Sequence, residues 1–173
     1  MPSRTEEMAS SAMGKVKGAK AALEGLSGVF RHLAQEHGEV SALLMRVKMS
    51  SDVELRRNLF PDIRKQLLSH ERGELREVYP VLNKYPQTKE IVERHGQEAT
   101  QLEHQIEKLQ KMNVEDAQWA QSFERLVDLV QHHVREEEDE FFPAAQRTIG
   151  EDETKKLLKR YEEAKSEEMS KLS

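Results

Sequence analysis

Two segments of the sequence repeat one pattern of histidine, glutamate and proline. They are HERGELREVYP, which begins at His70, and HVREEEDEFFP, which begins at His133. The segments align without a gap, five of their eleven positions are identical, and an aromatic residue precedes the proline in both. Each carries H-x-x-x-E, which pairs His70 with Glu74 and His133 with Glu137. Residues four positions apart differ by only about 40° around a helix, so each pair points to one place. An imidazole and a carboxylate in this arrangement can bind metal together.

A second register competes in the later segment, because His132 and Glu136 also have the H-x-x-x-E spacing. The prolines that end the two segments align His133, and not His132, with His70. His133 also lies on the apolar face of its segment. We therefore interpret His133 and Glu137 as facing inward and His132 as a flanking residue. The other acidic residues of the run are expected on the solvated side of the helix: Glu136, Glu138, Asp139 and Glu140.

Histidines interrupt each of the four apolar stripes that the chain contains. They are His37, His70, His95 and His133, and two of the stripes also carry a glutamate. An unpaired carboxylate in a low-dielectric core costs several kcal/mol, so residues of this kind on four converging faces need a common partner. A metal centre supplies one, because it compensates carboxylate charge and uses the imidazole lone pairs. The offset of 63 residues between the repeated segments favours a two-fold arrangement that holds two metals.

The stripes have helical spacing, and turn signals separate them near residues 50–52, 83–88, 112–116 and 148–153. This pattern predicts an all-α fold, an up-down-up-down four-helix bundle with an additional C-terminal helix. We expect a flexible N-terminal tail over residues 1–18, the bundle over 19–148, and a charged helix over 149–173 that lies outside the core.

Composition limits the remaining classes of function. The chain of 173 residues has no cysteine, which excludes disulfides, thiolate metal sites and cysteine nucleophiles. The net charge is −5 and the basic residues are dispersed, so we expect no nucleic-acid partner. No apolar run approaches the roughly 20 residues of a membrane span, and no secretory signal is visible. We therefore expect no membrane partner and a cytoplasmic location.

Together these motifs resemble a known family. EHGEVSALL around His37, H-x-x-x-E ending in Tyr-Pro, a third histidine segment, and H-x-x-x-E ending in Phe-Phe-Pro are similar to the hemerythrin family, and more closely to bacterial hemerythrin-like (HHE cation-binding) domains. The resemblance covers roughly residues 26–145. It implies a bundle around two iron ions that are oxo- or hydroxo-bridged. The ligands that it implies are His37, His70, Glu74, His133 and Glu137, with the two glutamates as bridges.

The third histidine segment departs from the family pattern. Many members present two histidines four residues apart there, whereas His95 is followed at that spacing by Ala99. His104 is the alternative ligand. His95 is favoured because it lies on the apolar stripe and because its distance from the following turn matches that of His133. With Ala99 in the second position, a water, an anion or another side chain must complete the shell of one iron. Glu36 and Glu103 are expected to be solvated rather than ligating.

The functional hypothesis is a di-iron protein that binds a small oxidant, namely O2, peroxide or NO, because an open coordination position can accept one. Peroxidase-like or catalase-like activity would make it an enzyme. The alternative is a non-catalytic protein for O2 binding, O2 or redox sensing, or iron handling. Manganese or zinc can occupy similar sites, and the sequence leaves the oligomeric state open.

Overall fold

The structure is a computed structural model that describes residues 3–173, and every regular element in this range is helical. The α-helices are α1 (Arg4–Leu23), α2 (Gly28–Lys48), α3 (Val53–Gly73), α4 (Tyr79–Leu82), α5 (Pro86–Lys111), α6 (Ala117–Glu136), α7 (Phe142–Ile149) and α8 (Glu151–Lys171). Two π-helical turns, η1 (Glu74–Val78) and η2 (Glu137–Phe141), continue α3 and α6. None of the helices in the described range combines the length and apolar character that crossing a bilayer requires. The expected all-α class is confirmed.

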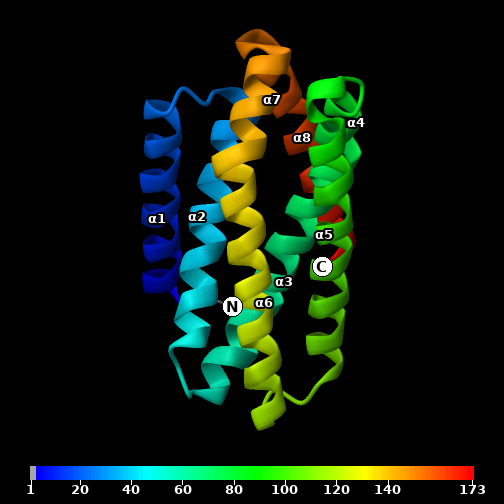
Figure 1. Cartoon of the computed structure of the whole chain (residues 1–173). Helices are drawn as coiled ribbons and strands as arrows, with labels where there is room; N and C mark the ends of the chain where they lie inside the picture. The colour runs from blue at the N-terminus through cyan, green and yellow to red at the C-terminus, as the bar shows by residue number, and fades with distance from the viewer. Residues whose placement is uncertain (1–2) are drawn as a thin grey trace.

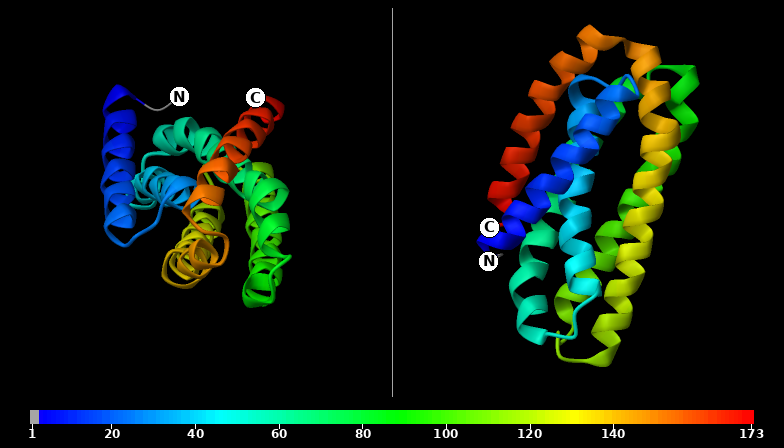
Figure 2. Two further views of the ribbon diagram at one scale, coloured as in Figure 1. Left: turned by 90° about the horizontal axis from the view of Figure 1, so that it is seen from above. Right: turned by 90° about the vertical axis from the view of Figure 1, so that its left-hand side faces the viewer.

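The long helices α2, α3, α5 and α6 lie alongside one another, and the chain direction alternates from each to the next (Figure 1). Helix α1 lies along α2, and α8 contacts both α2 and α3 (Figure 2). The links between the long helices fall at the turn signals of the sequence. At the start of α3, for example, the Asp52 carboxylate accepts hydrogen bonds from the Glu54 and Leu55 amides, which lack partners inside the helix.

Two apolar clusters fill the interior of the described chain, and buried polar residues lie between them. One is the Trp119 cluster, in which Trp119 stacks on Phe123 at 5.0 Å between ring centroids. The other is the Phe142 cluster, in which Phe142 packs on Phe30 at 5.4 Å. Along α2, His37 falls between Leu33 of the Phe142 cluster and Val40 of the Trp119 cluster. His95 on α5 lies between the two clusters in the same way. His70 and His133 lie near the ends of α3 and α6, where these helices leave the Trp119 cluster, so a polar layer crosses the core.

The N-terminal segment differs from the expected tail over residues 1–18, because residues 4–23 form helix α1. Residues 1 and 2 lie outside the described range. A capping box begins the helix: the Ser3 hydroxyl accepts from the Glu6 amide, and the Glu6 carboxylate accepts from the Ser3 amide. The close packing of α1 on α2 depends on a glycine. A Cβ atom on Gly38 of α2 would lie 2.7 Å from the carbonyl oxygen of Met13.

Helix α8 also differs from the expectation, because it does not lie outside the core. Four of its residues at helical spacing are buried: Thr154, Leu157, Tyr161 and Ala164. This narrow stripe was hidden by the charged residues that make up most of the helix. The ring of Tyr161 requires a glycine opposite it, since a Cβ on Gly73 would lie 2.8 Å from the ring carbon Cε2.

Candidate metal centre

The residues predicted as ligands lie on four helices and the two π-helical turns. His37 is on α2, His70 on α3, His95 on α5 and His133 on α6, while Glu74 begins η1 and Glu137 begins η2. All six are buried, with 0 to 7% of their surface exposed. The alternative third-helix residue, His104, is exposed on α5 and lies in none of the candidate metal-binding clusters of the described chain. The structure therefore brings His95, and not His104, to the other histidines.

Each π-helical turn begins at the glutamate of H-x-x-x-E and ends just before the aromatic-proline pair. The Tyr79 amide donates to the Glu74 carbonyl, five residues back, and the Phe142 amide donates to the Glu137 carbonyl in the same way. The next residue in each case is a proline, which has no amide hydrogen to donate. One wide turn therefore changes the helical register before each proline, and a short α-helix follows.

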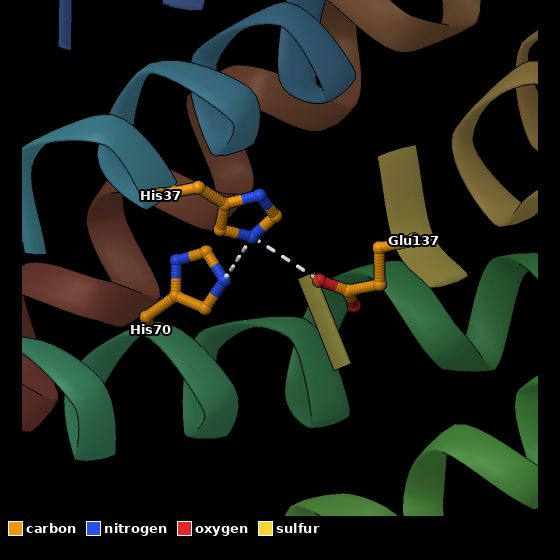
Figure 3. A group of neighbouring side chains, drawn as sticks. All are labelled: His37, His70 and Glu137. Carbon is orange, nitrogen blue, oxygen red and sulfur yellow. Dashed lines mark hydrogen bonds and ion pairs between the residues drawn. The ribbon is translucent and has the colours of Figure 1, made fainter. Parts of the chain in front are cut away.

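One half of the centre joins α2, α3 and η2 (Figure 3). The Nε2 atoms of His37 and His70 are 3.3 Å apart, and His37 Nε2 lies 3.1 Å from Glu137 Oε2. His70 Nε2 also lies 3.2 Å from Glu74 Oε2. The Nε2 atoms of His37 and His70 and the carboxylates of Glu74 and Glu137 are therefore neighbours.

The outer nitrogens of these two histidines are held by carboxylates. His37 Nδ1 lies 2.9 Å from Glu138 Oε1, and His70 Nδ1 lies 2.8 Å from Glu36 Oε2. A carboxylate accepts the Nδ1 hydrogen, which leaves the Nε2 lone pair facing inward, as metal-binding histidines require. The expectation that Glu36 and Glu138 are solvated is wrong, since each is paired with a buried imidazole from another helix.

The other half of the centre joins α5 and α6. The Nδ1 atoms of His95 and His133 are 3.3 Å apart, and His133 Nδ1 lies 2.8 Å from Glu98 Oε2. This hydrogen bond from His133 lowers the pKa of Glu98. His133 Nε2 lies 3.4 Å from Glu137 Oε1 and 3.4 Å from Glu71 Oε1. Glu137 therefore faces both halves, with one oxygen toward His37 and the other toward His133.

The chemistry of these residues fits a bound cation. Several buried ligand-type atoms have no hydrogen-bond partner: Glu71 Oε2, both oxygens of Glu74, Glu137 Oε2, His95 Nε2 and His133 Nε2. Burial, and then the charge of Glu137, raises the pKa of Glu74 to about 7. Two carboxylates buried this close together are costly unless positive charge compensates them, and a cation at their meeting point would do so.

Helix α8 supplies two contacts that the sequence did not reveal. The Tyr161 hydroxyl donates to Glu36 Oε2 at 2.6 Å and lies 3.2 Å from His70 Nδ1. Lys165 Nζ lies 2.6 Å from Glu36 Oε1. Glu71 and Glu98 were likewise missed, although both are near the predicted motifs. Tyr79, the aromatic residue before Pro80, also donates a hydrogen bond to Glu137 Oε1 at 3.4 Å.

A small cavity reaches the centre from the side of α8. Its volume is about 20 Å³, and its lining includes His37, His70, Glu71, His133, Val40 and Lys165. A cavity needs roughly 10–15 Å³ to hold one water molecule. The cavity therefore has room for one molecule of about that size beside the histidines.

Buried histidines and glutamates that converge inside a helical fold are typical of metal-binding proteins. Comparison with known proteins specifies the family: residues 28–145 match the model of the hemerythrin HHE cation-binding domain. The chain belongs to this family, as its motifs indicated, and family membership implies cation binding. Helix α1 and helix α8 lie outside the matched range.

One curated relative is a DNA nickase from a Nostoc species, which is 22% identical over 134 residues. The match covers 78% of this chain and 38% of the relative, so the chain spans well under half of that protein's length. No solved structure matches the chain significantly.

Proposed function

We propose that α2, α3, α5 and α6 form an up-down-up-down four-helix bundle that holds two iron ions and binds a small oxidant, namely O2, peroxide or NO. The proposed ligands are the six residues predicted from the sequence: His37, His70, Glu74, His95, His133 and Glu137. The alternating direction of the four helices supports the bundle (Figure 1).

The position of Glu137 is the observation that favours a site for two metal ions over a site for one. Its Oε2 faces His37 at 3.1 Å and its Oε1 faces His133 at 3.4 Å, so one carboxylate lies between two sets of imidazoles. Glu74 lies beside His70 on one side and groups with His133 and Glu137 on the other. Carboxylates shared between histidine pairs are the arrangement with which helical bundles bridge two metals.

Glu71 is the side chain that we propose in place of the absent second histidine of α5. It is 5% exposed, its Oε1 lies 3.4 Å from His133 Nε2, and its Oε2 has no hydrogen-bond partner. A carboxylate oxygen is a suitable ligand for iron beside imidazole. Ala99 contributes no donor, and Glu71 from the neighbouring helix can supply one.

Two ferrous ions, when bound, would each supply one electron, and together these would convert one peroxide and two protons to two molecules of water. An external electron donor would then return the irons to the ferrous state, and this peroxide reduction is the activity that we propose. The side chains around the centre supply a small binding space and a path for protons. The cavity of about 20 Å³ beside His37, His70 and His133 has room for one molecule about as small as water. Glu36 accepts hydrogen bonds from His70 Nδ1 and Tyr161 and pairs with Lys165, whose side chain is 17% exposed. These contacts give a proton a route from the surface to the edge of the centre.

The test begins with iron-free protein that is loaded anaerobically with Fe²⁺. We expect about two irons per chain and, after oxidation, near-ultraviolet absorption from a coupled ferric pair. A separate ferrous sample should consume peroxide faster than the iron-free protein, one molecule for each pair of irons oxidised, and an added electron donor should sustain the consumption. A folded protein that retains no iron would refute the proposal. Retention of two irons without peroxide consumption would identify the non-catalytic alternative of O2 binding, redox sensing or iron handling.

Single alanine variants test the third-helix ligand. His95→Ala should lose about half of the iron, because His95 lies within the buried cluster. His104→Ala is the matched control on the same helix and should retain both irons, since His104 is exposed. Loss of iron from the His104 variant alone would reverse the assignment.

Location in the cytoplasm and the absence of nucleic-acid and membrane partners remain proposals. DNA nicking belongs to the Nostoc relative, and the dispersed basic residues and net charge of −5 favour no such role here. Gel-shift measurement with duplex DNA at moderate salt tests this, and a stable complex would contradict it.

A further inference from the structure

A second cluster of metal-binding groups lies outside the buried centre, between α5 and α6. It consists of His132 and Glu136 on α6 and Glu98 on α5, whose ligand-type atoms all lie within 4.8 Å of one another. His132 Nε2 is 3.5 Å from Glu136 Oε1 and 3.9 Å from Glu98 Oε1. This is the competing H-x-x-x-E pair of the sequence, joined by a carboxylate from the facing helix. We call these three residues the outer cluster.

Glu98 belongs to the outer cluster and also contacts the buried centre. Its Oε1 faces His132, while its Oε2 lies 2.8 Å from His133 Nδ1 and 3.3 Å from His95 Nδ1. One carboxylate therefore lies between an exposed imidazole and two buried ones. A short rotation of this side chain would carry a bound cation from one set of groups toward the other.

Solvent reaches the outer cluster through a cavity of about 210 Å³. The cavity is lined by Glu98, His132 and His133, together with Arg94, Leu102 and Leu129. Since roughly 10–15 Å³ suffices for one water molecule, the cavity has room for a divalent cation with part of its water shell. By contrast, the cavity on the α8 side has a volume of only about 20 Å³.

The guanidinium of Arg94 lies beside Glu136, where we expect a captured cation to bind. Its Nε lies 3.4 Å from Glu136 Oε2 and its guanidinium contacts Glu140 at 2.9 Å. Neither Arg94 Nε nor Glu136 Oε2 makes a hydrogen bond of good geometry, although both atoms are buried. The guanidinium thus balances the carboxylate charge loosely, and a divalent cation with direct bonds to His132 and Glu136 can replace it.

We propose that the outer cluster captures Fe²⁺ from solution and passes it through Glu98 to the buried centre. This inference rests on the proposed iron centre, and it assigns His132 and Glu136 a role in loading rather than in the final coordination. One imidazole and two carboxylates form a weaker site than the buried ligand set, which suits a site that must release its ion.

The experiment follows Fe²⁺ uptake by the iron-free full chain under anaerobic conditions. Samples are quenched at intervals with a ferrous chelator, and the protected iron is counted. We expect His132→Gln and Glu136→Gln to reach the same two irons per chain as the wild type, but roughly tenfold more slowly, because a partner that helps to hold the ion is lost. Arg94→Gln should load faster, since it removes the competing cation.

Two matched controls separate capture from general charge effects. Glu140→Gln removes an acidic residue that also pairs with Arg94 but lies outside the outer cluster. His104→Gln removes an exposed histidine elsewhere on α5. Both should load at the wild-type rate. Wild-type loading rates for the His132 and Glu136 variants, or equal slowing by Glu140→Gln, would overturn the inference. Failure of the wild type itself to hold iron would refute the iron centre instead.

Discussion

Replacing Tyr161 by phenylalanine tests whether α8 helps to hold the metal centre. The ring is fully buried and packs against Gly73, and phenylalanine preserves that packing. The change therefore removes only the hydroxyl that donates to Glu36 at 2.6 Å. A hydrogen bond to a charged group contributes about 1.5–3 kcal/mol. Because Glu36 keeps His70 and Lys165, we expect the lower end, a loss of about 1.5 kcal/mol in the free energy of unfolding.

Iron affinity should fall as well, since Glu36 orients His70. Removing the partner of a metal-binding histidine costs 10- to 100-fold in affinity, and Tyr161 acts one contact further away, so we expect roughly tenfold. Urea unfolding of the iron-free protein measures the stability, and competition with a chelator measures the affinity. Tyr85→Phe, at a residue 37% exposed, is the control and should change neither.

The alanine variant separates the hydroxyl from the ring. Tyr161→Ala also removes the buried ring and should cost about 3–5 kcal/mol in the free energy of unfolding. Wild-type iron affinity in the Tyr161→Phe variant, with weakened affinity only in the Tyr161→Ala variant, would refute a role for the hydroxyl and leave α8 with packing alone.

Three further predictions concern the proposed ligand Glu71, the contact of α1 with α2, and the buried carboxyl group of Glu74. Glu71→Gln should weaken one iron by about 10- to 100-fold, so that dialysis leaves close to one iron per chain; two retained irons would exclude Glu71 as a ligand. Gly38→Ala should lower the free energy of unfolding, measured with urea, by about 1–3 kcal/mol, because its Cβ would lie 2.7 Å from the Met13 carbonyl oxygen. Gly96→Ala is the control and should not destabilise the protein, since no atom lies within 4 Å of the added Cβ. Burial raises the pKa of Glu74 from 4.5 to about 7, so the folded iron-free protein holds a proton that the unfolded chain has lost. Its stability to urea should therefore fall as the pH rises from about 4.5 to about 7, and Glu74→Gln should flatten that dependence.

The six residues that the structure gathers in the buried cluster could be found from the sequence because their signal is local. The i, i+4 pairing of His70 with Glu74 and of His133 with Glu137 depends only on helix geometry, and the prolines set the register. Apolar periodicity was also sufficient to place His95 inside and His104 outside. The turn signals between the long helices are local in the same sense.

The carboxylates that hold the outer nitrogens could not be found in this way. Glu36 and Glu138 are adjacent to ligand residues and acidic, so the sequence alone gives them a solvated position. Their burial depends on His70 and His37, which come from other helices. Helix α1 and the buried stripe of α8 depend on contacts of the same long-range kind, where a glycine on one helix admits the backbone or a ring from another.

The contact of Tyr161 and Lys165 with Glu36 also has a consequence for the order of assembly during synthesis. Helix α8 follows every ligand-bearing helix along the chain, and chains begin to fold from the N-terminal side while they are made. The growing chain therefore presents all of the proposed ligands, Glu71 included, before Glu36 receives its donors from α8. Iron that enters at this stage would exchange more readily, and docking of α8 would then retain it.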